Sequence, residues 1–479
     1  MLASLRDVLN RPIVAIVAVG LLAGVLRFVH LGYPQQREVD EYYYTKSACI
    51  YLGWSNRTCD ITSNDERYWR RTQDDTGAWV HPPLGKWAIA LGELAIGPNS
   101  FGWRVSSAIA GTATVVLVAA IAQLLFGSPL WTFVGGLLLA TEGLEFVQSR
   151  VAFLDIFVTF WITLGLLFVL VDRRWIVRRS PEPTAAALLE AEEEPSVVEP
   201  FWRPWRFAAG AALGAALASK WSGLTGIMAA IALSFVWEAV RRKHSGVRHP
   251  IWRAVQVEGF GIVVAYLALP AVIYVGSYLG WFLHFGFDLG AWIKLQGAIA
   301  SYHEHLSTID PVTHEPVHPY LAQAWKWILD WRPVAYYANY STPGVRKVIY
   351  AIGNPAILWG SILAVPWTAV AWWRRRDWRA GYILISIACL YLPWFPISRP
   401  QFFWYATPIM PFFVLVCVYA IRGLSELHIA GSRSRPYVPV AVGFVLLSVA
   451  WFVFFWPVLT GGSLTDAAYR LRVWFPTWT

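Results

Sequence analysis

Long apolar runs recur along almost the whole of this 479-residue chain, and they constrain its fold more than any other feature. A helix needs about 20 mostly apolar residues to cross the hydrocarbon core of a bilayer. Eleven segments meet or come close to that length, at about 12–30, 103–126, 130–147, 151–171, 206–219, 222–240, 255–280, 348–371, 380–396, 402–421 and 438–459. The sequence therefore predicts an all-α polytopic membrane protein with about eleven transmembrane helices.

Composition excludes the main alternatives. Hydrophobic residues make up 57% of the chain and charged residues 14%, whereas about a quarter of an ordinary soluble domain is charged. A disordered chain is excluded by the same proportions. The formal net charge of +9 does not indicate a nucleic-acid partner, because the basic residues cluster in short loops between the apolar runs.

Those basic loops predict the orientation. They follow the fourth, sixth, eighth and tenth predicted spans, and they contain Arg173, Arg174, Arg178, Arg179, Arg241, Arg242, Lys243, Arg374, Arg375, Arg376, Arg422, Arg433 and Arg435. Because cytoplasmic loops are enriched in Lys and Arg, these loops are expected inside the cell, together with the N-terminus.

The resulting organisation has five parts. They are a cytoplasmic segment with the first helix (1–30), a first outer loop (31–102), helices two to seven with an acidic cytoplasmic loop near 172–205 (103–280), a second outer loop (281–347), and helices eight to eleven with an outer C-terminal tail (348–479).

An adjacent acidic pair, Asp40 and Glu41, opens the first outer loop. Adjacent side chains point in different directions on a helix or a strand, so the two are not expected to act on one atom. One carboxylate can serve as a general base while the other makes a structural contact. A solvated acidic pair is the alternative interpretation.

The same loop contains the sequence His-Pro-Pro-Leu-Gly-Lys at residues 81–86. Two prolines stiffen the backbone, so the loop can hold His81 and Lys86 at fixed positions near the membrane surface. Alternatively, the prolines mark only the start of a helix.

Several charged residues lie at or just inside the ends of predicted spans. Among them, Arg104, Arg150 and Asp155 are expected to face a polar cavity or to pair together, because a charge at the centre of a membrane helix costs about 2.5–3.5 kcal/mol on insertion scales. A mutual ion pair between Arg150 and Asp155 is the structural alternative.

Two cations, Lys220 and Arg399, fall at outer junctions between predicted spans. The topology rule disfavours cations on the outer side, so a local reason is needed, and an anionic ligand of about the size of a phosphate supplies one. Snorkelling of the two long side chains is the alternative.

The predicted outer loops also contain a pair of histidines that could bind a metal and a pair of cysteines that could form a disulfide. His303 and His305 form a His-x-His pair, but no further ligand stands at a metal-binding spacing, so no metal site is predicted and a divalent metal is an unsupported alternative. Cys49 and Cys59 can form a disulfide if their compartment is oxidising.

Taken in chain order, these motifs resemble the protein O-mannosyltransferase family, which has the GT-C glycosyltransferase fold. The resemblance runs through Asp40 and Glu41, residues 81–86, 101–104, 148–150 with 154–155, 219–221 and 399–403. It implies transfer of mannose from a polyprenyl phosphate to Ser or Thr of an exported protein. The stretch 281–347 is too short for the trefoil-type domain of eukaryotic members, which fits the bacterial ones.

The resemblance, together with the chemistry, gives each residue an expected role. Asp40 is expected to be the base and Glu41 to position the acceptor. Lys220, Arg399 and Arg104 are expected at the donor phosphate, although Arg104 can instead orient the acidic loop. The supporting residues are His81, Lys86, Arg150 and Asp155.

Inverting transfer on the outer face of the cell membrane is expected, with no required cofactor. The expected partners are polyprenyl phosphate mannose, Ser/Thr-containing exported polypeptides, the lipid bilayer and the protein-export machinery. A polyprenyl-phosphate-sugar transferase with another sugar or acceptor is one alternative, and a transporter is another.

Overall fold

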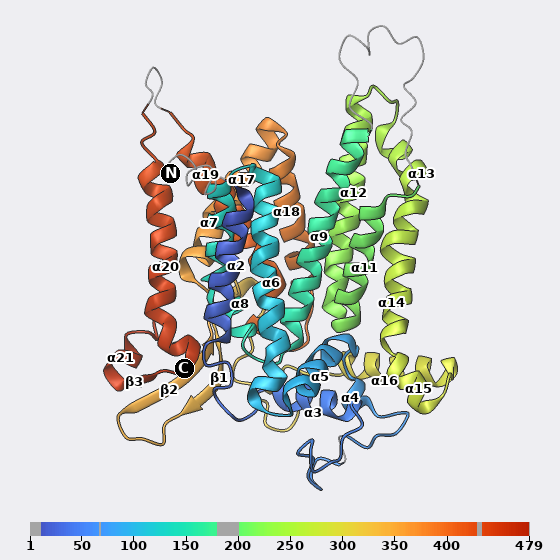
Figure 1. Cartoon of the computed structure of the whole chain (residues 1–479), viewed down its shortest axis with the longest axis vertical. Coiled ribbons are helices and arrows are strands. Elements are labelled where there is room, and N and C mark those ends of the chain that lie inside the picture. The colour runs from blue at the N-terminus through green and yellow to red at the C-terminus, as the bar shows by residue number, and fades with distance from the viewer. Residues whose placement is uncertain (1–10, 67–68, 180–200, 429–433, 479) are drawn as a thin grey trace.

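The computed structural model describes residues 11–66, 69–179, 201–428 and 434–478. Within these residues the chain is mostly helical, and the long helices lie side by side along one direction (Figure 1). Short helices and a small sheet gather at one end of this bundle (Figure 1). We call this group of short elements the end layer.

Among the described residues, seven helical segments are long and apolar enough to cross a membrane. They are α6 (Ser100–Phe126), α9 (Leu154–Arg179), α12 (Leu224–His244) with η1 (Trp221–Gly223), α13 (Pro250–Val263) continuing through η2 (Val264–Ala268) into α14 (Leu269–Ser277), α17 (Pro355–Arg375), η5 (Phe403–Ile409) with α19 (Met410–Ser425), and α20 (Val438–Thr460). Four shorter helices run beside them, namely α2 (Pro12–Phe28), α7 (Pro129–Ala140), α11 (Pro204–Ser219) and α18 (Trp378–Tyr391) (Figure 1). The chain is a multi-pass membrane protein.

Two predicted spans differ from the observed helices. The span predicted at 130–147 is divided into α7 and α8 (Gly143–Gln148), because the extended residue Glu142 ends the first helix and its carboxylate caps the second. The span predicted at 348–371 begins inside strand β2 (Val345–Ala351), and α17 starts only after Asn354 caps it. Valine, isoleucine and tyrosine in β2 favour a strand when a neighbouring strand is available.

The end layer is built from segments distant in sequence. Its helices are α3 (Glu41–Tyr51), α4 (Thr76–Trp79), α5 (Leu84–Ile96), α15 (Leu279–Phe285) and α16 (Leu289–Glu304). Strands β1 (Val334–Asn339), β2 and β3 (Ser463–Thr465) form an antiparallel sheet in that order, and the short elements η3 (Ala324–Lys326), η4 (Leu392–Trp394), α21 (Asp466–Arg470) and η6 (Pro476–Trp478) complete the described structure. A disulfide between Cys49 and Cys59 ties α3 to the loop that follows it.

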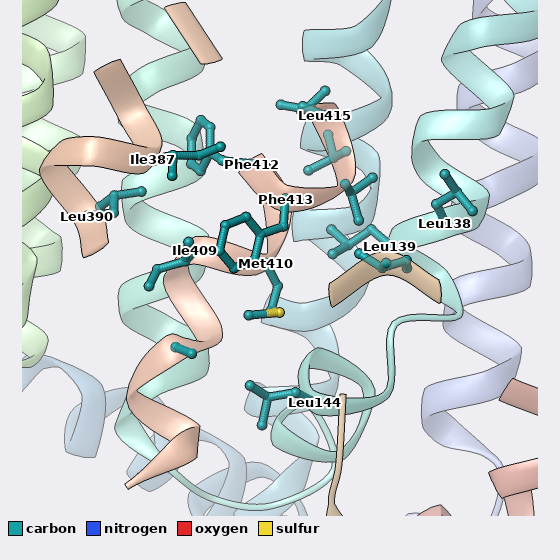
Figure 2. Close-up of a cluster of buried hydrophobic side chains, with 14 of the residues drawn as sticks. Leu138, Leu139, Leu144, Ile387, Leu390, Ile409, Met410, Phe412, Phe413 and Leu415 are labelled. Carbon is teal, nitrogen blue, oxygen red and sulfur yellow. The ribbon is translucent and has the colours of Figure 1, made fainter. Parts of the chain in front are cut away.

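Helix α19 forms the centre of the bundle. Within its span, 94% of the most apolar window is buried, more than in any other span. Figure 2 shows apolar side chains of α7, α8 and α18 packed against those of η5 and α19. The first group contains Leu138, Leu139, Leu144, Ile387 and Leu390, and the second contains Ile409, Met410, Phe412, Phe413 and Leu415. This packing fixes the segment around 399–409, which belongs to the site described below.

Close packing positions α11 in a similar way. A Cβ atom on Gly210 would lie 1.9 Å from the carbonyl oxygen of Ala265, so the two backbones approach as only glycine permits. Helix α11 ends at Ser219, and the next residue, Lys220, has extended backbone. The Lys220 side chain is therefore presented at the end of the bundle that carries the end layer.

Candidate active site

Asp40 lies at the start of α3, just beyond the loop that follows α2. Its side chain makes no helix-capping hydrogen bond, and one carboxylate oxygen accepts the Tyr44 hydroxyl at 3.1 Å. Burial raises the pKa of Asp40, although the Lys220 ammonium acts to lower it. A carboxylate with a raised pKa is a stronger base, as removal of a hydroxyl proton requires.

The backbone before Asp40 is strained. Val39 has a φ of 48°, which is a genuine outlier for a β-branched residue. Such conformations cost on the order of 1–3 kcal/mol and persist where the surrounding contacts impose them. One such contact is the Glu38 amide, which donates to Glu41 Oε2 at 3.0 Å. The Glu41 carboxylate therefore helps to hold the turn that presents Asp40.

Glu41 occupies a different environment from its neighbour. It is fully buried, and its two carboxylate oxygens accept Nε and Nη2 of Arg104 at 2.7 Å each. The Ala152 amide also donates to Glu41 Oε1 at 2.8 Å. Glu41 thus joins α3 to α6 and to the turn before α9. Because both oxygens are engaged inside the protein, the structure does not support the predicted role of Glu41 in positioning the acceptor.

Arg104 is likewise occupied. Besides Glu41, it donates to the carbonyl oxygens of Leu31, Pro34 and Gln36 at 3.3, 2.7 and 3.1 Å. These three carbonyls belong to the loop that carries Asp40, so the N–H groups of Arg104 are taken up within the protein. The Arg104 side chain is fully buried. Because these N–H groups are engaged inside the protein, the geometry favours the second predicted role of Arg104, orientation of the acidic loop, over a contact with the donor phosphate.

The loop at residues 81–86 is held by its own lysine. Lys86 Nζ donates to the carbonyl oxygens of Ala78 and His81 at 2.6 and 3.1 Å. Burial lowers the pKa of Lys86 to about 7. Burial also lowers the pKa of His81 well below its usual range, so its imidazole is neutral at physiological pH. The Lys86 hydrogen bonds therefore fix the backbone of the loop at His81.

Lys220 is paired with a carboxylate. Its ammonium donates to both oxygens of Asp155 at 2.9 Å and lies 4.4 Å from the centre of the Tyr405 ring. Asp155, in the first turn of α9, is therefore not the partner of Arg150 that the sequence alternative proposed. Arg150 instead donates to four carbonyl oxygens at and beyond the end of α2, those of Leu26, Arg27, Val29 and His30.

Arg399 completes the cationic side of the site. Its Nη1 lies 3.1 Å from Nδ1 of His303, whose Nε2 lies 3.1 Å from the carbonyl oxygen of Val80. The rings of His81 and His303 are stacked with their centres 5.1 Å apart. A cavity of about 440 Å³ is lined by all of these groups, namely His81, Lys220, His303 and Arg399, together with apolar side chains of α12 and η4.

His303 is the functional candidate that sequence reasoning missed. Its His-x-His spacing suggested only a metal ligand, whereas the structure places it between Arg399 and the loop of His81. His305 instead contacts Ser301. In the described parts of the chain, no group of three or more His, Cys, Asp or Glu side chains is placed to hold a metal ion.

Comparison with solved structures shows the fold. The S. cerevisiae protein O-mannosyltransferase Pmt1–Pmt2 complex bound to the sugar donor matches with a TM-score of 0.74 and 13% identity, covering 100% of this chain and 94% of that chain. ArnT from Cupriavidus metallidurans bound to undecaprenyl phosphate matches with a TM-score of 0.53 and 19% identity, covering 96% of this chain and 74% of that chain. The fold is that of the GT-C membrane glycosyltransferases.

Sequence comparison then specifies the family. Residues 17–285 match the family described as dolichyl-phosphate-mannose-protein mannosyltransferase, and residues 289–478 match the C-terminal four TMM region of protein-O-mannosyltransferase. The polyprenol-phosphate-mannose–protein mannosyltransferase of Mycolicibacterium smegmatis (strain MKD8) is 31% identical over 498 residues, covering 95% of this chain and 91% of the relative. The chain belongs to the protein O-mannosyltransferase family, of the bacterial type, and the resemblance drawn from its motifs is confirmed.

Proposed function

We propose that this protein transfers mannose from a polyprenyl phosphate to the hydroxyl of Ser or Thr in an exported polypeptide. The observation that carries the proposal is the juxtaposition of Asp40, whose pKa is raised by burial, with the cations of the adjoining cavity, Lys220 and Arg399. A base for a hydroxyl and a cationic site for a phosphate are the two requirements of this reaction.

The proposed step is a direct displacement at the anomeric carbon. The acceptor oxygen forms a bond to the anomeric carbon, and the bond from that carbon to the phosphate oxygen breaks. The electron pair leaves with the phosphate, and the hydroxyl proton passes to Asp40. Attack opposite the phosphate inverts the anomeric centre, and no covalent bond between sugar and protein forms.

Lys220 and Arg399 stabilise the charge that develops on the phosphate. Lys220 is buried and Arg399 is partly buried, and a charge in such a site interacts more strongly than it does in water. Asp155 holds the Lys220 ammonium from one side, so the lysine is positioned before the donor arrives. Such fixed charges need no reorganisation when the leaving group departs.

The polyprenyl chain has an apolar path beside the cavity. Leu224 and Met228 lie four residues apart on α12, so they share one face of the helix. Both line the cavity and are 49% and 43% exposed. We place the first isoprene units of the donor against this face, which leads from the phosphate site toward the lipid.

The remaining predicted site residues act by positioning. Glu41 and Arg104 fix the loop of Asp40, Lys86 fixes the loop of His81, and Arg150 fixes the end of α2. None of these four is assigned a contact with the reacting atoms.

For topology, we propose that α2, α7, α11 and α18 span the membrane with the seven longer segments, which makes eleven spans. The end layer then lies on the outer face, with 31–102, 281–347 and the C-terminal tail. Exposed Thr313 in the second outer loop and exposed Lys243 at the other end of the bundle allow a matched test. In intact cells an impermeant thiol reagent should label Thr313→Cys and not Lys243→Cys, and the reverse pattern contradicts the orientation.

The decisive assay supplies membranes that contain this protein with radiolabelled polyprenyl phosphomannose and a Ser/Thr-rich peptide. Mannose on the peptide hydroxyl, absent with Asp40→Asn, supports the proposal. The alternative is a transferase for another sugar. Transfer from a different polyprenyl phosphosugar, with none from polyprenyl phosphomannose, would contradict the proposed donor and support this alternative.

A further inference from the structure

A second large cavity lies on the opposite side of the bundle from the proposed donor site. It has a volume of about 440 Å³ and shares no lining residue with the first. Its lining comes from the chain just beyond α2, from the end of α20 and from strands β2 and β3. These elements lie near one another at the same end of the bundle (Figure 1). Its lining comprises Val29, His30, Tyr33, Arg150, Lys347 and residues of 456–463.

The cavity is positively charged. Arg150 and Lys347 line it together with His30, and no Asp or Glu belongs to the lining. In the described part of the chain, Arg150 makes hydrogen bonds only to backbone carbonyls, and the Lys347 ammonium has neither an ion pair nor a hydrogen bond. Two cations without a carboxylate partner favour an anionic ligand.

An apolar stripe leads to this cavity along α2. Ile13, Val17, Leu21, Val25 and Val29 follow one another at intervals of four residues, so they form a single stripe on the helix surface. Their side chains are between 46% and 68% exposed, and Val29 also lines the cavity. The stripe is therefore continuous with the cationic cavity at its end.

Trp456 adds a third feature. It lines the same cavity from the last turns of α20, and tryptophan is enriched where a membrane helix meets the headgroup region. A phospholipid consists of an anionic headgroup and apolar acyl chains. The cationic cavity suits the headgroup, and the exposed apolar stripe that runs from it along α2 suits an acyl chain.

We infer that this cavity binds the phosphate headgroup of an anionic phospholipid, with the Lys347 ammonium on the phosphate and an acyl chain along the stripe of α2. Arg150, whose hydrogen bonds go to backbone carbonyls, adds positive charge to the wall of the cavity. Inorganic phosphate presents the same anionic chemistry but makes no use of the stripe. The site is separate from the proposed sugar transfer, and a ligand there contacts both the end of α2 and strand β2.

The test uses the full chain purified in a mild detergent and titrated with phosphatidylglycerol, with bound lipid counted by native mass spectrometry. Wild type should bind one lipid with an affinity that Lys347→Gln lowers about tenfold, as expected for loss of one charged contact. Lys347→Arg should restore binding. The matched control is Lys326→Gln, which removes the same charge from η3, outside this cavity, and should leave the affinity unchanged.

Equal affinities for Lys347→Gln and Lys326→Gln overturn the assignment. Equal binding of phosphatidylcholine, or complete displacement of the lipid by inorganic phosphate at a similar concentration, also overturns it. Because no sugar donor or acceptor is present, the result is independent of whether the proposed mannosyl transfer is correct.

Discussion

Arg399 and His303 are 96 residues apart in the chain, yet Arg399 Nη1 lies 3.1 Å from His303 Nδ1. Arginine can only donate, so Nδ1 of His303 carries no proton. The proton of the neutral ring is then on Nε2, which donates to the carbonyl oxygen of Val80. Burial and the Arg399 charge lower the pKa of His303 to about 4, which keeps the ring neutral and Arg399 in place.

Replacing His303 should weaken donor use without abolishing chemistry. His303→Phe removes the acceptor for Arg399, so we expect KM for the donor to rise about tenfold while kcat changes less. His303→Asn keeps an acceptor near the position of Nδ1 and should restore part of the effect. His305→Phe, at an exposed position on the same helix end, is the control. A loss confined to kcat in His303→Phe contradicts the positioning role.

Replacing the two adjacent acids should affect different properties, turnover for Asp40 and stability for Glu41. Asp40→Asn should lower turnover about 10²–10⁴-fold with little change in thermal stability, because it removes a base from a half-buried site. Glu41→Gln leaves the buried Arg104 without its counter-charge and should cost about 3–5 kcal/mol of stability. Turnover with saturating donor and acceptor and thermal unfolding in detergent measure the two effects. The assignment is wrong if Glu41→Gln is as stable as wild type.

The acid limb of the pH profile should report Asp40. Its folded-state pKa is raised by burial, so as pH falls the base is protonated, and activity lost, at a higher pH than for an ordinary aspartate near 3.9. The Tyr44 hydroxyl lowers the pKa of Asp40 by donating to it. Tyr44→Phe should therefore move the acid limb of kcat to still higher pH. An unmoved limb indicates that another group titrates there.

Lys220 should contribute to both stability and donor use, and a double variant can separate the two. Lys220→Ala leaves Asp155 buried without a partner, so a loss of about 3–5 kcal/mol of stability is expected beside weaker donor use. Adding Asp155→Asn should restore most of the stability but not the donor affinity. Recovery of both in the double variant shows that Lys220 serves only to pair with Asp155.

Replacing Arg399, the second cation of the cavity, tests the proposed phosphate site independently of Lys220. Arg399→Ala should weaken donor use strongly, because phosphate charge is left uncompensated in a poorly solvated site. Arg399→Lys should recover only part, because the planar fork that binds two oxygens is lost. The measurement is the donor KM in detergent or membranes, and donor kinetics like those of wild type in Arg399→Ala contradict the assignment.

The sequence by itself determined the membrane class and the family. An apolar run long enough to cross a bilayer must form a helix there, because no other single segment satisfies its backbone hydrogen bonds in lipid. Whether a segment meets this requirement depends only on its own length and hydrophobicity, so a window of about 20 residues is enough to predict a membrane helix. The family was indicated by short motifs taken in chain order, from Asp40 and Glu41 through residues 81–86 to 399–403, each of which is also local in sequence.

Only the tertiary structure decided what each charged residue does. Asp40 and Glu41 look alike in sequence, but Arg104 and the Ala152 amide, 63 and 111 residues from Glu41, occupy the Glu41 carboxylate. The Asp40 carboxylate instead accepts the Tyr44 hydroxyl. Asp155 pairs with Lys220 rather than with nearby Arg150, and strand β2 forms because β1 and β3 lie beside it. Such partners are set by how distant segments pack, and neither hydropathy nor spacing along the chain contains that information.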